Sequence, residues 1–317
     1  MTTDRNQLPI AIIGAGPVGL AAAAHLHGRN LPFVILEAGT EVGHAVRSWG
    51  HVQLFSPWQY CVDPAAARLL EQAGWQHPEP ESYPDGNALV EQYLVPLAAH
   101  PAIAPQLRLG TRVIAVTRVG TDKMKNAGRE EAPFELHVAQ ADGSEALLQA
   151  RAVIDASGTY HTPNPLGASG LPAPGERALA DRIVYGIPDV LGKNRARYAG
   201  KRVLVAGSGH SAFNAILELA VLSQQAPGTE ITWVVRRGTM GQAYGGGEND
   251  ALPARGALGQ RIRTLVEQGQ VRLVTGWRTD RLERTVDGIV VHAGTQALEP
   301  VDELIVTTGL RPDLAML

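Results

Sequence analysis

Three glycines near the N-terminus, Gly14, Gly16 and Gly19, follow the short apolar run Ile10–Ile13 and precede an alanine-rich stretch. This order predicts a strand, a tight turn and a helix, the arrangement that binds the pyrophosphate of a dinucleotide. Gly14 would allow the turn, Gly16 would let the pyrophosphate approach the backbone, and Gly19 would let the helix pack closely on the strand. The N-terminus of the helix would then face the anionic phosphates.

A carboxylate ends the next apolar run. Leu31–Glu37 predicts a second strand, and Glu37 lies about 20 residues beyond the glycines, where an acid can accept hydrogen bonds from the hydroxyls of an adenosine ribose. A Rossmann-like turn that binds no cofactor is the alternative. The complete order of strand, loop, helix, strand and acid favours the cofactor.

The same order returns in the second half of the chain. The apolar run Lys201–Ala206 leads into a second turn and helix, made of Gly207, Ser208, Gly209, His210, Ser211 and Ala212. The strand after it, Ile231–Arg237, ends in Arg236 and Arg237 instead of an acid. Two guanidinium groups suit a 2′-phosphate, which favours NADPH over NADH, although a solvated basic pair at a strand end is the simpler alternative.

Each half also ends in a strand of small residues, Arg151–Thr159 in the first and Leu304–Asp313 in the second, after several strand-like runs. Glycine loop, strand end, β-meander and small-residue strand thus occur twice in one order. This duplication predicts an α/β fold with two Rossmann-like dinucleotide-binding domains, each with a parallel sheet and a β-meander.

The domain boundaries expected from this order are residues 1–162 for the first domain with an insertion over 43–100, 163–197 for a linker region, 198–308 for the second domain, and 309–317 for the start of a return segment to the first domain. The clearest helix of the insertion is expected over Ala88–His100.

Composition narrows the class of protein. The chain has 317 residues and a formal net charge of −3, so no global positive field would attract nucleic acid. Its single cysteine, Cys61, excludes a disulfide within the chain. We find no signal peptide and no apolar run that would span a membrane, which indicates the cytoplasm. The histidines lack metal-ligand spacing, so no metal site is expected.

With both halves placed, the chain resembles the flavoproteins with two dinucleotide-binding domains, and among them the flavin-containing monooxygenase-like group. The motifs that carry the resemblance are Gly14–Gly19, Glu37, Asp155–Tyr160, Gly207–Ala212, Arg236–Arg237 and Thr307–Pro312. The resemblance implies that the first loop binds FAD and the second NADPH, with cofactor contacts from Gly14, Gly16, Pro17, Gly19, Glu37, Arg47, Ser48, Trp49, Val113, Ala156, Ser157, Gly158, Gly207, Ser208, Gly209, His210, Ser211, Ala212, Arg236, Arg237, Thr308 and Gly309.

Two stretches of the chain have alternative interpretations. In similar flavoproteins the stretch Arg47–Trp49 approaches the isoalloxazine, but Trp49 could equally pack in the domain core. The loop 244–250, with Glu248, Asn249 and Asp250, is either a connector or a lid over nicotinamide or substrate.

The resemblance implies hydride transfer from NADPH to FAD, and then oxygenation of a small organic substrate. No catalytic acid, base or nucleophile stands out, because the flavin itself would supply the chemistry. The alternatives are a reductase that passes electrons to a quinone, a disulfide or a protein carrier, and a non-catalytic module that binds cofactors or senses redox state.

The sequence departs from this family in two places. The monooxygenase fingerprint, an aromatic–glycine pair leading to a histidine, is not visible over residues 175–198. The chain also stops at Leu317, whereas the family's FAD domain receives a further strand and helix. We therefore expect an apolar groove beside residues 14–19 and 157–159, weak FAD retention, and a tendency to form homodimers or aggregates.

Overall fold

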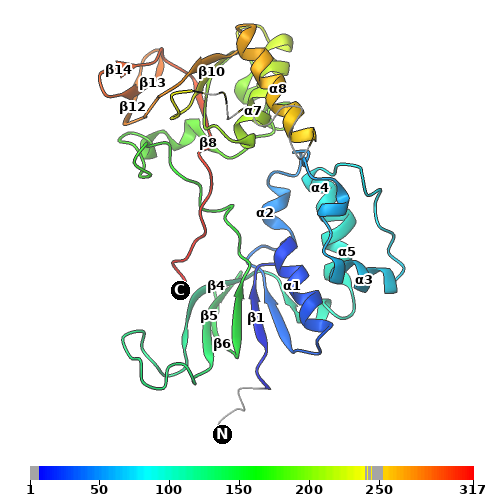
Figure 1. The fold of residues 1–317 in the computed structure, drawn as a ribbon. Coiled ribbons are helices and arrows are strands. Elements are labelled where there is room, and N and C mark those ends of the chain that lie inside the picture. The colour runs from blue at the N-terminus through cyan, green and yellow to red at the C-terminus, as the bar shows by residue number, and fades with distance from the viewer. Residues whose placement is uncertain (1–6, 240, 242–243, 245–252) are drawn as a thin grey trace. The chain divides into compact units, whose positions relative to one another are not determined.

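The computed structural model describes residues 7–239, 241, 244 and 253–317, and the chain divides into two compact units (Figure 1). The first unit comprises residues 1–161 and 312–317, and the second comprises residues 162–311. Each unit contains a parallel sheet and a separate three-stranded antiparallel sheet. The fold class expected from the duplicated sequence pattern is therefore confirmed.

The parallel sheet of the first unit has the strand order β3-β2-β1-β7. Its strands are β1 (Ile10–Ile13), β2 (Phe33–Leu36), β3 (Leu107–Arg108) and β7 (Ala152–Asp155). Because side chains alternate along a strand, Ile10 and Ile12 of β1 pack against helices, whereas Ala11 and Ile13 pack against the antiparallel sheet. Both faces are covered, which explains the uninterrupted apolar sequence of these strands.

The antiparallel sheet of the first unit is a meander of β4 (Thr111–Arg118), β5 (Phe134–Gln140) and β6 (Glu145–Ala150). The C-terminal residues of the chain lie on it. The Val116 amide donates to the Met316 carbonyl at 2.7 Å, and the Met316 side chain packs against the core between the two sheets.

The helical elements of the first unit are α1 (Pro17–His27), α2 (His44–Arg47), η2 (Trp58–Tyr60), α3 (Pro64–Gln72), α4 (Gly86–Leu89), η3 (Val90–Leu94), α5 (Val95–Ala99) and η4 (Ala104–Gln106). The helix expected over 88–100 is present as α4, η3 and α5, and η3 is a π-helical turn. Pro96 has no amide to give to the carbonyl of Gln92. The indole of Trp75 donates to that carbonyl instead, at 2.8 Å.

The parallel sheet of the second unit has the order β11-β10-β9-β15-β8. Its strands are β8 (Ile183–Tyr185), β9 (Arg202–Ala206), β10 (Glu230–Val234), β11 (Arg272–Val274) and β15 (Glu303–Val306). On β9, Val203 and Val205 face the helices α7 (His210–Gln225) and α8 (Pro253–Glu267), and Leu204 faces the meander. The same layering therefore occurs in both units.

The remaining elements of the second unit are η5 (Arg177–Arg182), α6 (Arg195–Tyr198), β12 (Arg281–Thr285), β13 (Gly288–Ala293) and β14 (Gln296–Ala297). Residues 163–197, expected as a linker, lie within this unit and supply β8 to the edge of its sheet. A strand of three residues is too short for its side chains to show a period of two, which is why the sequence pattern did not indicate it. In the described part of the chain, no helix is long and apolar enough to cross a membrane.

Candidate cofactor sites

The first glycine loop joins β1 to α1, and its three glycines are in different environments. Gly14 has a φ of +101°, and a Cβ there would lie 2.6 Å from the carbonyl oxygen of Ala156. A Cβ at Gly19 would overlap the carbonyl oxygen of Gly14. At Gly16, by contrast, a Cβ would meet no atom within 4 Å. Protein packing thus accounts for Gly14 and Gly19, whereas the open space at Gly16 fits the approach of a phosphate.

Glu37 connects this loop to the end of β2. Its carboxylate accepts a hydrogen bond from the amide of Ala15 at 2.6 Å and another from the amide of Gly39 at 2.7 Å. A carboxylate offers about four lone-pair positions, so two acceptor positions remain for ribose hydroxyls. Pro17 occupies the first turn of α1, where its missing amide costs no helical hydrogen bond.

Arg47 and Trp49, which were expected to approach the isoalloxazine, have other contacts in the structure. Arg47 lies 3.0 Å from Glu41 and donates to Glu91 at 2.6 Å, so its guanidinium is already paired with two carboxylates. Trp49 packs against the helical core, and a Cβ at Gly86 would lie 3.0 Å from its ring.

Ser48 and Val113 have different surroundings. The Ser48 hydroxyl donates to the His44 carbonyl at 3.3 Å. Burial raises the pKa of Tyr160, and a hydrogen bond with Ser48 partly offsets that rise. Val113 is buried in the core between the parallel sheet and the meander.

The small-residue segment after β7 faces the first loop. The Ala156 amide donates to the Ile13 carbonyl at 2.9 Å. Ser157 donates to Asp155 through its amide at 3.0 Å and through its hydroxyl at 2.6 Å. Gly158 has a φ of +75° and an open position at Cβ, so backbone groups rather than side chains are presented here.

The second glycine loop joins β9 to α7 and repeats this geometry. Gly207 has a φ of +136°, and a Cβ there would overlap the Thr307 carbonyl oxygen. A Cβ at Gly209 would meet nothing within 4 Å, as at Gly16. The ring of His210 packs edge-on against Phe213 at 5.8 Å. Ser208 lies between the two glycines, and Ser211 and the buried Ala212 lie in the first turn of α7.

A hydrogen bond that occurs in both units shows which of their residues are equivalent. The Gly14 amide donates to the Leu36 carbonyl at 2.8 Å, and the Gly207 amide donates to the Val234 carbonyl at 3.2 Å. Leu36 and Val234 are therefore equivalent positions at the ends of β2 and β10.

This equivalence shows that the expected position of Arg236 and Arg237 was wrong. The residue after Leu36 is Glu37, and its equivalent in the second unit is Val235. Arg236 and Arg237 lie one and two positions further along, so they do not occupy the position of Glu37 as the sequence pattern had suggested. In the second unit the apolar Val235 takes the place of the acid, and the two arginines come directly after it.

A cavity of about 300 Å³ lies at the carboxyl end of the second sheet. Residues from the glycine loop and both arginines line it, together with Trp277, Thr279, Thr308 and Gly309. The Thr308 hydroxyl donates to the Asn164 carbonyl at 2.8 Å, and the Asn164 amide donates to the Gly309 carbonyl at 2.9 Å. Seven of the predicted residues of the second unit line this cavity, namely Gly207, Ser208, Gly209, Arg236, Arg237, Thr308 and Gly309, whereas His210, Ser211 and Ala212 do not. The predicted residues 248–250 lie outside the described part of the chain.

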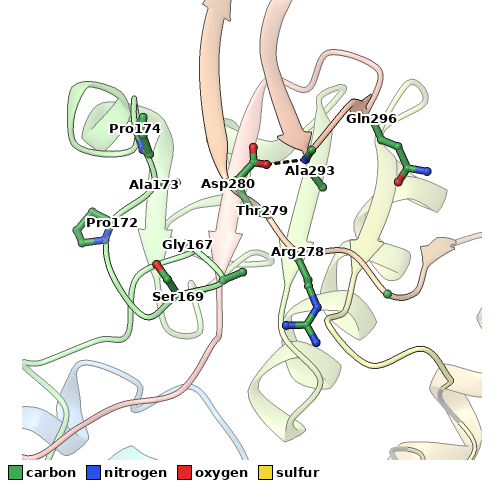
Figure 2. Close-up of a pocket in the computed structure, with 13 residues that line it drawn as sticks. Gly167, Ser169, Pro172, Ala173, Pro174, Arg278, Thr279, Asp280, Ala293 and Gln296 are labelled. Carbon is green, nitrogen blue, oxygen red and sulfur yellow. Dashed lines mark hydrogen bonds between the residues drawn. The ribbon is translucent and has the colours of Figure 1, made fainter.

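A second cavity, of about 550 Å³, is drawn in Figure 2 and shares Thr279 with the first. Arg278 lines only the second cavity, Trp277 lines only the first, and Thr279 lines both. The Asp280 carboxylate accepts the amide of Gly294, as the dashed line in Figure 2 shows. The second cavity shares a wall with the first but has neither its glycine loop nor its arginine pair.

Comparison with known proteins decides the family. The family model described as pyridine nucleotide-disulphide oxidoreductase matches residues 134–317, which is more than half of the chain. The chain belongs to this family. A second model, an NAD(P)-binding Rossmann-like domain, matches residues 12–72 and so covers the first glycine loop. The protein is an enzyme, an oxidoreductase that uses FAD and NADP.

Similar proteins include both ferredoxin–NADP reductases and monooxygenases. The ferredoxin–NADP reductase of Salinispora arenicola is 28% identical, over 98% of this chain and 77% of its own. That of Gluconobacter oxydans is 30% identical, over 98% and 74%. The indole-3-pyruvate monooxygenase YUCCA1 of Oryza sativa is 30% identical over 66% of this chain and 44% of its own.

Solved structures show the same fold. The bacillithiol disulfide reductase of Bacillus cereus has a TM-score of 0.72 at 19% identity, over 98% of this chain and 80% of that one. A mutant flavin monooxygenase from Stenotrophomonas maltophilia has a TM-score of 0.61 at 24% identity, over 98% and 80%.

Several residues at the sites were not indicated by the sequence. Glu176, which is 1% exposed, accepts hydrogen bonds from Leu166, Ala173 and Tyr185 and thereby holds the segment that lines both cavities. Burial, followed by the contact with Glu176, raises the pKa of Tyr185. A lone glutamate in a proline-rich stretch carries no motif, so no signal in the sequence could have indicated it.

Proposed function

We propose that this enzyme takes hydride from NADPH, bound at the second glycine loop, to FAD, bound at the first, and passes the electrons to a separate acceptor. The observation that carries the proposal is the extent of similarity. The ferredoxin–NADP reductases align with 98% of this chain, whereas the rice monooxygenase aligns with 66%. A reductase is therefore preferred to the monooxygenase that the sequence motifs suggested first.

The residues of the first unit would hold the flavin cofactor, which supplies a ring that accepts hydride and releases electrons. The amides at the start of α1 would bind its pyrophosphate, and the open position at Gly16 would admit it. Glu37 would orient its adenosine through the ribose while keeping the loop in place through the Ala15 amide. These groups bind and orient, and none of them needs to transfer a proton.

The residues of the second unit would select the hydride donor. Arg236 and Arg237 are both exposed at the cavity that contains the second loop, where they would bind a 2′-phosphate. An apolar residue, Val235, stands where an acid would repel that phosphate. This combination supports NADPH over NADH.

The acceptor that we propose is based on the single cysteine of the chain and on the names of its relatives. Cys61 is the only cysteine, its thiol lies 3.5 Å from the Ser56 carbonyl, and burial raises its pKa. A partly buried thiol with a raised pKa is a poor nucleophile, so reduction of a disulfide through Cys61 is disfavoured. A one-electron protein carrier, as in the name of the Salinispora relative, is the acceptor that we propose.

A monooxygenase is the second candidate, favoured by the similarity to the rice enzyme and by the flavin monooxygenase fold match. One experiment separates the two. The full chain is loaded with FAD, reduced by NADPH without oxygen, and then given either an oxidised iron–sulfur protein or oxygen with a candidate organic substrate. Rapid return of the flavin absorbance with the iron–sulfur protein supports the reductase. Return with oxygen together with an oxygenated product, and no reaction with the carrier, would overturn it.

A further inference from the structure

The two glycine loops differ at their third position. In the first unit a Cβ at Gly19 would overlap the Gly14 carbonyl oxygen, so α1 packs directly against that carbonyl. The equivalent residue in the second unit is Ala212, which is fully buried. Its methyl group occupies the space that the carbonyl takes in the first unit, so the carbonyl of Gly207 cannot be placed as that of Gly14 is.

A tryptophan side chain donates a hydrogen bond to the Gly207 carbonyl in its changed position. The Trp233 indole Nε1 donates to the Gly207 carbonyl oxygen at 2.7 Å. The φ of Gly207 is +136°, against +101° for Gly14. Trp233 immediately precedes Val234, so its equivalent in the first unit is Ile35, which has no side-chain donor. The indole hydrogen bond therefore belongs to the second loop only.

The indole is held firmly in place. Trp233 is fully buried on β10, which lies between β11 and the central strand β9, and pairs in register with Val205 of β9. Phe213 packs edge-on against its ring at 5.8 Å, and Tyr244 does so at 6.3 Å. A donor fixed on several sides holds its acceptor more tightly than a mobile side chain would.

We propose that Trp233 is a positioning residue of the NADPH loop. Its indole N–H fixes the Gly207 carbonyl and replaces the close helix contact that a third glycine provides in the first loop. The amides of Ser208 and Gly209 are thereby kept in the orientation that the pyrophosphate requires. Among the described residues Gly207 lines the cofactor cavity and Trp233 does not, so Trp233 acts through Gly207. This inference rests on the proposal that the second loop binds NADPH.

The first test replaces Trp233 by Phe in the full chain and measures the Kd for NADPH by fluorescence titration. The ring is kept and the donor is lost, so we expect binding to weaken about 5-fold, the value of one neutral hydrogen bond. FAD content should not change. Phe213→Leu is the matched control, because it disturbs the same aromatic packing but leaves the indole donor. It should lower the Tm without changing the Kd for NADPH.

The second test adds Ala212→Gly to Trp233→Phe. Removing the methyl group lets the carbonyl return toward α7, so NADPH affinity should recover to within about 2-fold of the wild type, although a Gly in a helix lowers stability. A purely structural role for Trp233 predicts the opposite, because two losses of packing add. If Trp233→Phe alone does not fold, the double variant carries the test by itself.

Two results would overturn the inference: a Trp233→Phe variant with wild-type affinity for NADPH, or a double variant that binds NADPH more weakly than Trp233→Phe does. Failure of the proposed function looks different. In that case the paired replacement of Arg236 and Arg237 by Ala would also leave the Kd for NADPH unchanged.

Discussion

Replacing the middle glycine of either loop by valine should weaken the binding of one cofactor and leave the other unchanged. Gly16 has φ −82° and ψ −173°, which any residue can adopt, and its Cβ position is open. The apoprotein should therefore tolerate Gly16→Val with little change in stability, because the gain of about 0.4–1 kcal/mol from a less free unfolded chain is offset by the poor fit of valine at the N-cap of α1. Gly209, with φ −99° and ψ 178°, offers the same opportunity in the second loop.

The expected loss of binding follows from the contacts that the side chain would block. If the valine side chain in Gly16→Val keeps a pyrophosphate from two backbone amides, each charge-assisted hydrogen bond is worth about 1.5–3 kcal/mol. The sum of about 3–6 kcal/mol corresponds to FAD binding weaker by roughly 10²- to 10⁴-fold. Gly209→Val should weaken NADPH by a similar factor and leave FAD in place.

Titration of flavin-free protein with FAD, and of FAD-loaded protein with NADPH, gives the two Kd values, and thermal melts of the apoproteins give stability. Gly14→Ala is the contrasting variant, because a φ of +101° and a Cβ 2.6 Å from the Ala156 carbonyl oxygen should destabilise the fold itself. Unchanged FAD affinity in a folded Gly16→Val protein would refute the assignment of the first loop.

Three further changes test other parts of the structure. Replacing Arg236 and Arg237 together by Ala should weaken NADPH by a few kcal/mol and NADH much less, and an equal loss of the two affinities would assign the arginines another role. Glu176→Gln should lower the free energy of unfolding by about 1–3 kcal/mol in denaturant titrations, because one amide oxygen cannot accept all three hydrogen bonds, and an unchanged transition would count against that network. Asp63→Ala should cost about 1 kcal/mol at neutral pH, since Asp63 caps α3. Burial would raise the pKa of Asp63, but hydrogen bonds from Ala66, His25 and Ala65 outweigh burial, and the pKa is lowered. The difference in the free energy of unfolding between the variant and the wild type should therefore vanish as pH falls through that lowered pKa. A constant difference down to pH ~2 would contradict the role of Asp63 as a cap.

The amino-acid sequence by itself determined the features that depend on neighbouring residues. Gly14 and Gly207 were identified because a positive φ at a tight turn selects glycine locally, whatever the rest of the chain does. The apolar strands and the alanine-rich helix follow from short-range patterns in the same way. Because these patterns occur twice in the same order, the two-unit α/β fold and its pair of cofactors could also be predicted.

Only the tertiary structure decided the contacts that join distant segments. The Thr308 hydroxyl meets the Asn164 carbonyl 144 residues away, and Trp233 reaches Gly207 from a neighbouring strand. The register that places Val235, and not an arginine, at the position equivalent to Glu37 depends on hydrogen bonds between strands. Such pairings are set by how the sheets and helices pack, and residue types along the chain do not encode them locally.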